Sequence, residues 1–98
     1  MHNIDTQTIL QLTSLCYQKG DLDLSYHYSS QLLIEEPDNT FAMIIRARVS
    51  NEWKSYQNAI EELDYLLEFI DKENAEALQL REDILLSLKS EYSWKMYG

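Results

Sequence analysis

Few residues in this chain could carry out chemistry. It contains two histidines and one cysteine among 98 residues. His2 stands next to the first residue, and His27 stands between two tyrosines in a stretch that is compatible with a helix. Neither histidine belongs to a cluster with the composition and spacing of metal ligands. The sequence therefore predicts no metal site.

The acidic residues and the single thiol do not form a catalytic pattern either. Acid–base catalysis needs two carboxyl groups in a dry cleft with different pKa values. Glu61, Glu62 and Asp64 instead alternate with an apolar stripe, so they are expected to face water. Cys16 is expected on the core face of a helix, where an unreactive thiol is much commoner than a nucleophile. With two glycines, the chain has no glycine-rich phosphate loop. We predict a non-enzymatic protein with no catalytic residue and no cofactor.

Charge and composition exclude further classes of function. Seventeen Asp and Glu against eight Lys and Arg give a net charge of -9, which should repel phosphate backbones and anionic lipids. No apolar run approaches the roughly 20 residues of a membrane-spanning helix. One cysteine cannot form an internal disulfide, which fits a reducing compartment. We therefore predict a single-domain cytoplasmic protein that binds no nucleic acid and does not insert into a membrane.

The elements that would position any site are predicted to be helices. Two glycines and one proline leave little material for the many turns of a β fold. Gly20 and Asp21 separate two helix-compatible stretches, and Pro37 ends the second of them. We predict an all-α fold of five helices over residues 5–19, 21–36, 38–51, 56–70 and 75–90, followed by an aromatic-rich tail over 91–98.

Apolar and small residues at spacings of three and four predict the buried face of each helix. Ser25 and Ser29 stand where two helices could approach closely. The expected core positions are Ile9, Leu12, Leu15 and Cys16 in the first helix; Leu22, Ser25, Ser29, Leu32 and Leu33 in the second; Phe41, Ile44 and Ile45 in the third; Tyr56, Ala59, Ile60, Leu63, Leu66, Leu67 and Ile70 in the fourth; and Ala77, Leu78, Ile84, Leu85 and Leu88 in the fifth.

This alternation of helix, tight turn, helix and break resembles the tetratricopeptide repeat, a helix–turn–helix unit of about 34 residues. In the first unit, residues 6–39, the turn at Gly20 and the small residue Ser25 match the family pattern. In the second unit, residues 40–74, Tyr56, Ala59 and Ile60 match its Tyr-x-x-Ala-Ile signature. Residues 75–90 would form a C-terminal capping helix, so the resemblance implies about two and a half repeats.

The chain departs from the family pattern at several places. Lys54 and Ser55 replace the Gly-Asp of the turn in the second unit. Arg46 occupies a position that is usually apolar, and Thr13 replaces a small residue in the first helix. These are the positions at which the second unit and the first helix are expected to differ from the pattern.

The resemblance implies a binding groove, because ligands of the family lie against the inner face of each first helix. Carried over by position, the groove would be lined by Leu10, Ser14, Tyr17, Phe41, Ile44, Ile45, Arg48, Gln79 and Asp83. The lysines and asparagines with which some members clamp acidic C-termini are absent from these positions. An apolar floor with an acidic exit fits an amphipathic partner helix that carries Lys or Arg. The alternative is that Phe41 and Ile44 pack inside the array.

A second candidate surface is the aromatic tail, with Tyr92, Trp94, Met96 and Tyr97. Aromatic side chains at this density tend to be covered by something. The tail is expected to fold back over the last helix as a cap, or else to dock a partner or a second copy of the chain.

Small, acidic, helical-repeat proteins without enzyme activity are similar to the dedicated chaperones of bacterial type III secretion. Some of those are tetratricopeptide proteins that hold a needle or translocator subunit. Repeat arrays usually need about three units for stability, so a hetero-complex with a helical protein partner is expected. The alternatives are an adaptor subunit of another assembly and a self-associating repeat protein.

Overall fold

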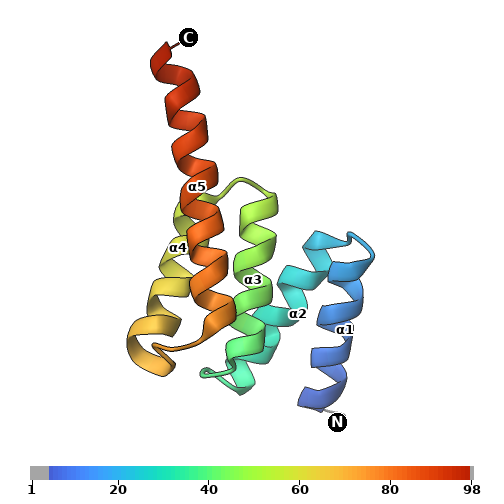
Figure 1. Ribbon diagram of the computed structural model, residues 1–98. Helices are drawn as coiled ribbons and strands as arrows, with labels where there is room; N and C mark the ends of the chain where they lie inside the picture. The colour runs from blue at the N-terminus through green and yellow to red at the C-terminus, as the bar shows by residue number, and fades with distance from the viewer. Residues whose placement is uncertain (1–4, 98) are drawn as a thin grey trace.

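The structure is a computed structural model that describes residues 5–97, and the side chains of residues 5–91. Its elements are α1 (Thr6–Gln18), α2 (Leu22–Glu35), α3 (Thr40–Glu52), α4 (Tyr56–Tyr65), the π-helical segment η1 (Leu66–Ile70) and α5 (Ala75–Tyr97). Residues 5–97 contain five α-helices and no strand. The predicted all-α class is thus confirmed (Figure 1).

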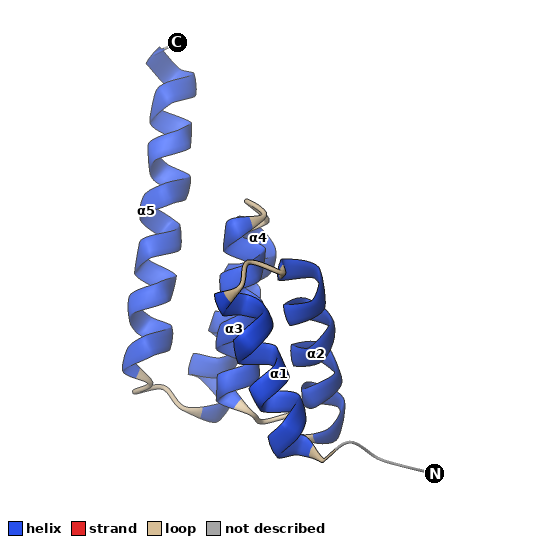
Figure 2. Cartoon of the chain, turned by 90° about the vertical axis from the view of Figure 1, so that its right-hand side faces the viewer, coloured by secondary structure: helices blue, strands red, loops and turns tan. Residues whose placement is uncertain are grey.

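The helices form two antiparallel hairpins, α1–α2 and α3–α4, to which α5 is added (Figure 1). The central helix is α3, which contacts α1, α2, α4 and α5. The C-terminal part of α5 projects beyond the other helices (Figures 1 and 2). The chain is accordingly elongated, with extents of 57 × 28 × 17 Å and a radius of gyration of 14.6 Å, against about 12.6 Å for a compact domain of this length.

The helix starts are fixed by side-chain caps, which explains why the sequence predicts them to within two residues. A cap satisfies a backbone N–H that the first turn leaves without a partner. Asp5, Asp21, Asn39 and Asn74 accept hydrogen bonds from the N–H groups of Thr8, Leu24, Ala42 and Ala77 at 2.8, 3.3, 2.9 and 2.9 Å. Ser55, at the start of α4, makes no such bond.

The two hairpin turns have the same backbone geometry despite their different residues. Gly20 has a φ of 81° and Lys54 a φ of 63°. In each turn the next N–H, from Asp21 or Ser55, donates to the carbonyl five residues earlier at 2.8 Å. Lys54 therefore adopts the left-handed conformation that glycine adopts more easily.

The main core lies between α3, α4 and α5. Its buried members are Met43, Ile44, Ala47, Ala59, Leu63, Leu66, Ala77, Leu80 and Ile84. A smaller cluster of Ile9, Leu32 and Ala42 joins α1 and α2 to α3. The apolar stripe predicted for residues 56–70 is confirmed at Ala59, Leu63 and Leu66.

Small polar residues make part of the contact between α1 and α2. Thr13, Ser25 and Ser29 are completely buried, and the Ser25 Oγ donates to the Thr13 carbonyl at 3.1 Å. The two predicted serines are thus buried as expected. Leu15 was expected in the core but is exposed. Thr13, one turn after the buried Ile9, is buried instead.

The predictions for the last helix are partly wrong. The helix does not end at residue 90 but continues to Tyr97, since residues 87–97 contain no glycine or proline that would end it. The backbone of the tail extends α5 and does not fold back as a cap (Figure 1). Leu78 and Leu85, expected in the core, are exposed, and Leu80 is buried instead.

Arg46, at a position expected to be apolar, joins three helices. Its Nε and Nη2 donate to the two carboxylate oxygens of Glu62 in α4 at 2.5 and 2.7 Å, and its Nη1 donates to the Ser30 Oγ in α2 at 3.1 Å. The hydrogen bond with Glu62 raises the pKa of Arg46 above its ordinary value. The guanidinium also lies 5.7 Å from the ring centre of Tyr26. At this half-buried position, an ion pair stabilises the side chain in place of apolar contacts.

Candidate binding surface

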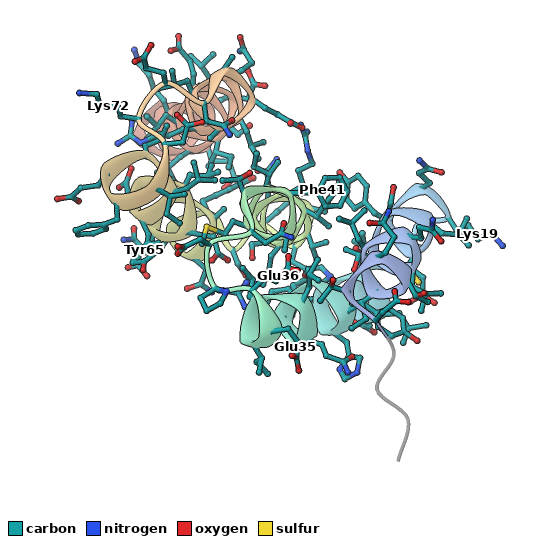
Figure 3. The ribbon with its side chains drawn as sticks, turned by 90° about the horizontal axis from the view of Figure 1, so that it is seen from below. Lys19, Glu35, Glu36, Phe41, Tyr65 and Lys72 are labelled. Carbon is teal, nitrogen blue, oxygen red and sulfur yellow. The ribbon has the colours of Figure 1, made fainter. Side chains whose placement is uncertain are left out.

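One side of the molecule is formed by the first helix of each hairpin and by α5. Figure 3 shows α3 between α1 and α5, with α2 and α4 on the opposite side. Phe41 lies on the side of α3 that faces the space between α1 and α5 (Figure 3). We call this side the three-helix face. We assign to it the remaining residues of the predicted groove, Leu10, Ser14, Tyr17, Phe41, Arg48, Gln79 and Asp83. To these we add Glu76, which pairs with Arg48, and Glu52, whose charge acts on Tyr17.

The apolar part of the three-helix face is smaller than the sequence predicts. Phe41 is 37% exposed, whereas Ile44 and Ile45 are 4% and 8% exposed. Ile44 belongs to the main core, so these two isoleucines are not accessible to a ligand. The alternative that Ile44 packs inside the array is therefore correct, while Phe41 remains accessible. Leu10 and Tyr17, the apolar residues that the predicted groove takes from α1, are half-buried.

The charged part of the face spans the gap between α3 and α5. The Arg48 Nη2 lies 2.8 Å from the Glu76 Oε2, and both side chains are substantially exposed. An exposed pair of this kind is worth at most about 1 kcal/mol, so a ligand could replace it. On α5, the Gln79 Nε2 donates to the Asp83 Oδ1 at 3.0 Å. Glu76, Gln79 and Asp83 share one face of the helix because they are three and four residues apart.

A third acidic group extends the face towards the turn between α1 and α2. Burial raises the pKa of the Tyr17 hydroxyl, and the negative charge of Glu52 raises it further. An open hollow of about 500 Å³ adjoins these two residues and is lined by Tyr17, Gln18, Gly20, Leu22 and Glu52. Three acidic residues, Glu52, Glu76 and Asp83, and one basic residue, Arg48, are assigned to the face, so its net charge is negative.

The residues considered for chemistry stand apart. Among the residues that the structure describes, no three His, Cys, Asp or Glu side chains are grouped so that they could hold a metal ion. His27 is exposed and contacts Tyr28 edge-on, with ring centres 5.5 Å apart. Cys16 is a free thiol and is half-buried rather than part of the core. No helix within residues 5–97 has the length and apolarity to cross a bilayer.

Sequence reasoning missed an exposed apolar surface on α5. Leu78, Leu85 and Leu86 are exposed along this helix, next to a hollow of about 300 Å³ lined by Leu78, Arg81, Glu82, Leu85, Leu86 and Lys89. We call this surface the open face of α5. A signal was present, because α5 carries two apolar stripes: one of Ala77, Leu80 and Ile84, and one of Leu78 and Leu85. A helix with two apolar stripes needs two neighbours.

The predicted tail surface falls in the last turns of α5. Tyr92, Trp94, Met96 and Tyr97 belong to the helical backbone of α5. Their side chains lie outside the described residues.

The chain was compared with protein-family models, with curated proteins and with solved structures, and it matches none of them. The resemblance to tetratricopeptide repeats therefore remains a prediction from the residue pattern.

Proposed function

We propose that this chain is a non-enzymatic protein–protein interaction module of the tetratricopeptide type, whose three-helix face holds an amphipathic helix of a partner protein. The observation that carries the proposal is the accessible ring of Phe41 on a face whose charged residues are mostly acidic. Large aromatic side chains that are surrounded by polar groups are common anchors of protein interfaces.

The shape and charge of the face suit a helix better than an extended peptide. The described residues contain no strand whose edge could pair with an extended chain. A helix can instead lay its apolar side on Phe41, Leu10 and Tyr17. Lysine or arginine residues at its margins would then face Glu52, Glu76 and Asp83. The partner is therefore expected to be amphipathic and basic.

The narrower form of the proposal is a chaperone, similar in size and charge to the chaperones of type III secretion subunits. Such a protein keeps an aggregation-prone client soluble. An adaptor subunit of another assembly is the alternative, and it would bind partners that are stable alone. The two are distinguished by expressing the partner without this chain and measuring how much of it stays soluble.

The test starts with affinity capture of the full chain from its native host, followed by calorimetric titration of the purified partner. Phe41→Glu is expected to weaken binding at least about ten-fold, since it places a charge in the apolar part of the face. Phe69→Glu is the matched control, because Phe69 is an exposed aromatic residue of η1 outside the three-helix face. Equal binding by the wild type and Phe41→Glu would show that the partner uses another surface.

A further inference from the structure

The open face of α5 adjoins the three-helix face but extends to the other side of the helix, where Leu78 and Leu85 lie. Ala77, Leu80 and Ile84 are buried against α3 and α4. The flank with Gln79 belongs to the three-helix face. The other flank carries Leu78 and Leu85, and Leu86, which is 59% exposed, lies between them and Gln79 and lines the same hollow as Leu78 and Leu85. A row of exposed leucines bordered by charges is typical of an interaction surface.

The corresponding flank of α3 is covered by another helix. Leu78 follows Met43 by 35 residues, and each is the fourth residue of its helix. Met43 packs in the core with Ala59 and Leu63 of α4. Within the described residues, α5 has no helix in the position that α4 has beside α3 (Figure 1). The open face of α5 is therefore a helix-binding surface by its place in the fold.

The order of charges along this face indicates which helix it binds. Glu82 precedes Leu85 and Leu86, and Lys89 follows them. In an antiparallel pair of α5 helices centred between Leu85 and Leu86, each Glu82 stands opposite the Lys89 of the other copy. Leu85 then stands opposite Leu86. Read in the opposite direction, the order Glu82, Leu85, Leu86, Lys89 therefore places each charge opposite its counter-charge and leucine opposite leucine. A two-fold symmetric interface requires a surface that complements itself in this way.

We propose that a second copy of this chain covers the open face of α5 and forms a two-fold, antiparallel helix pair. The neighbouring Arg81 is bonded to Asp64 of α4, with its Nε 2.6 Å from the carboxylate. It therefore does not disturb the match between Glu82 and Lys89. The 23 residues of α5 span about 34 Å, and its C-terminal part projects past the hairpins (Figure 2).

The first test is the mass of the full chain by sedimentation over a wide range of concentrations. The expected result is a reversible shift towards twice the monomer mass of 11.6 kDa. Leu86→Glu should remain monomeric with an unchanged helical circular dichroism signal, because Leu86 is exposed in the single chain. The matched control is Ile34→Glu in α2, where Ile34 is 78% exposed and outside α5; it should still dimerise.

The second test concerns orientation. Glu82→Lys and Lys89→Glu should each weaken dimerisation about ten-fold, because each reversal turns two attractions into two repulsions. The double variant, Glu82→Lys with Lys89→Glu, should regain the wild-type affinity. A parallel pair would place like charges opposite each other in every case and would show neither the loss nor the recovery. These surface changes leave the core intact, so they test the proposal even if Leu86→Glu does not fold.

Several results would overturn the proposal. They are a monomer at every concentration, a dimer that persists in Leu86→Glu, and a dimer that Ile34→Glu also abolishes. Capture of a different protein on this face by a monomeric chain would overturn it as well. Phe41→Glu should leave the dimer unchanged, so this proposal and the proposed function can fail separately.

Discussion

The two hairpins have the same backbone geometry and differ in the side chains that are buried inside them. Residues 34 positions apart occupy equivalent places: Asp5 and Asn39 cap their helices, and Gly20 and Lys54 turn the chain with positive φ. Inside the hairpins the equivalents diverge. The completely buried Ser29 of α2 corresponds to the completely buried Leu63 of α4.

This difference indicates that the same plan is stabilised in two ways. The first hairpin relies on the close approach of α1 and α2 at small residues and on the hydrogen bond from Ser25 to Thr13. The second relies on apolar volume, which continues into α5. Burial of apolar area contributes more to stability than a single hydrogen bond. We therefore expect the first hairpin to unfold at a lower free energy than the second.

The largest loss of stability is expected when a buried apolar side chain of the second hairpin is shortened. Leu63→Ala should lower the free energy of unfolding by about 2–5 kcal/mol, because it leaves a cavity in a closed core. Urea denaturation followed by circular dichroism measures the change. Ser29→Ala, at the equivalent place of the first hairpin, should cost less than about 1 kcal/mol. Equal losses in both variants would remove the distinction between the hairpins.

The next largest effect is expected from giving the first hairpin the side chain of the second. Ser29→Leu should destabilise the chain by about 1–3 kcal/mol, because Ser29 is completely buried and a larger side chain there would displace its neighbours. Ser25→Ala is the control, since alanine already stands at the equivalent Ala59. It should cost about 1 kcal/mol or less, for the lost hydrogen bond. Stabilisation by Ser29→Leu would show that the hairpin has unfilled space.

Substitutions at the two turn residues should change the stability of the chain in opposite directions. Lys54→Gly should stabilise the chain by about 1 kcal/mol, because glycine adopts a positive φ without steric cost. Gly20→Ala should destabilise it by a similar amount. No atom lies within 4 Å of a Cβ placed at Gly20, so the cost comes from the backbone alone. Thermal denaturation of both variants tests this, and shifts of the same sign would contradict it.

The smallest effect is expected at the first cap of the first hairpin. The Thr8 N–H holds the pKa of Asp5 below its ordinary value, so the cap is present at neutral pH and is lost as the pH falls through that lowered pKa. Loosening of the start of α1 is therefore expected well below about pH 4. The amide chemical shift of Thr8 reports it. Asp5→Asn should remove this pH dependence while keeping an acceptor, in the way that Asn39 caps α3.

The sequence predicts the helix starts and the first turn well because they depend on local chemistry. Asp5, Asn39 and Gly20 act on the backbone within a few residues, and a single sequence shows them directly. The buried stripe of α4 is also predictable, because only one side of that helix is covered and its apolar residues follow one period.

The accessible part of the binding surface is less predictable, because it depends on tertiary neighbours. On α3, Met43, Ile44 and Ile45 are all buried because the helix has neighbours on several sides. No periodic pattern tells which of them would face a groove. On α5 the reverse holds: Leu78 and Leu85 have the sequence pattern of core residues, and only the arrangement of helices leaves them exposed.

The π-helical segment η1 explains why the repeat of 34 positions does not continue through the chain. The Asp71 N–H donates to the Leu66 carbonyl, five residues earlier, at 2.9 Å. A π turn of this kind accommodates one inserted residue within a helix. The cap of α5, Asn74, accordingly follows Asn39 by 35 positions instead of 34. The insertion is absorbed before α5 begins, so Ala77, Leu80 and Ile84 keep the register of Ala42, Ile45 and Val49 in α3.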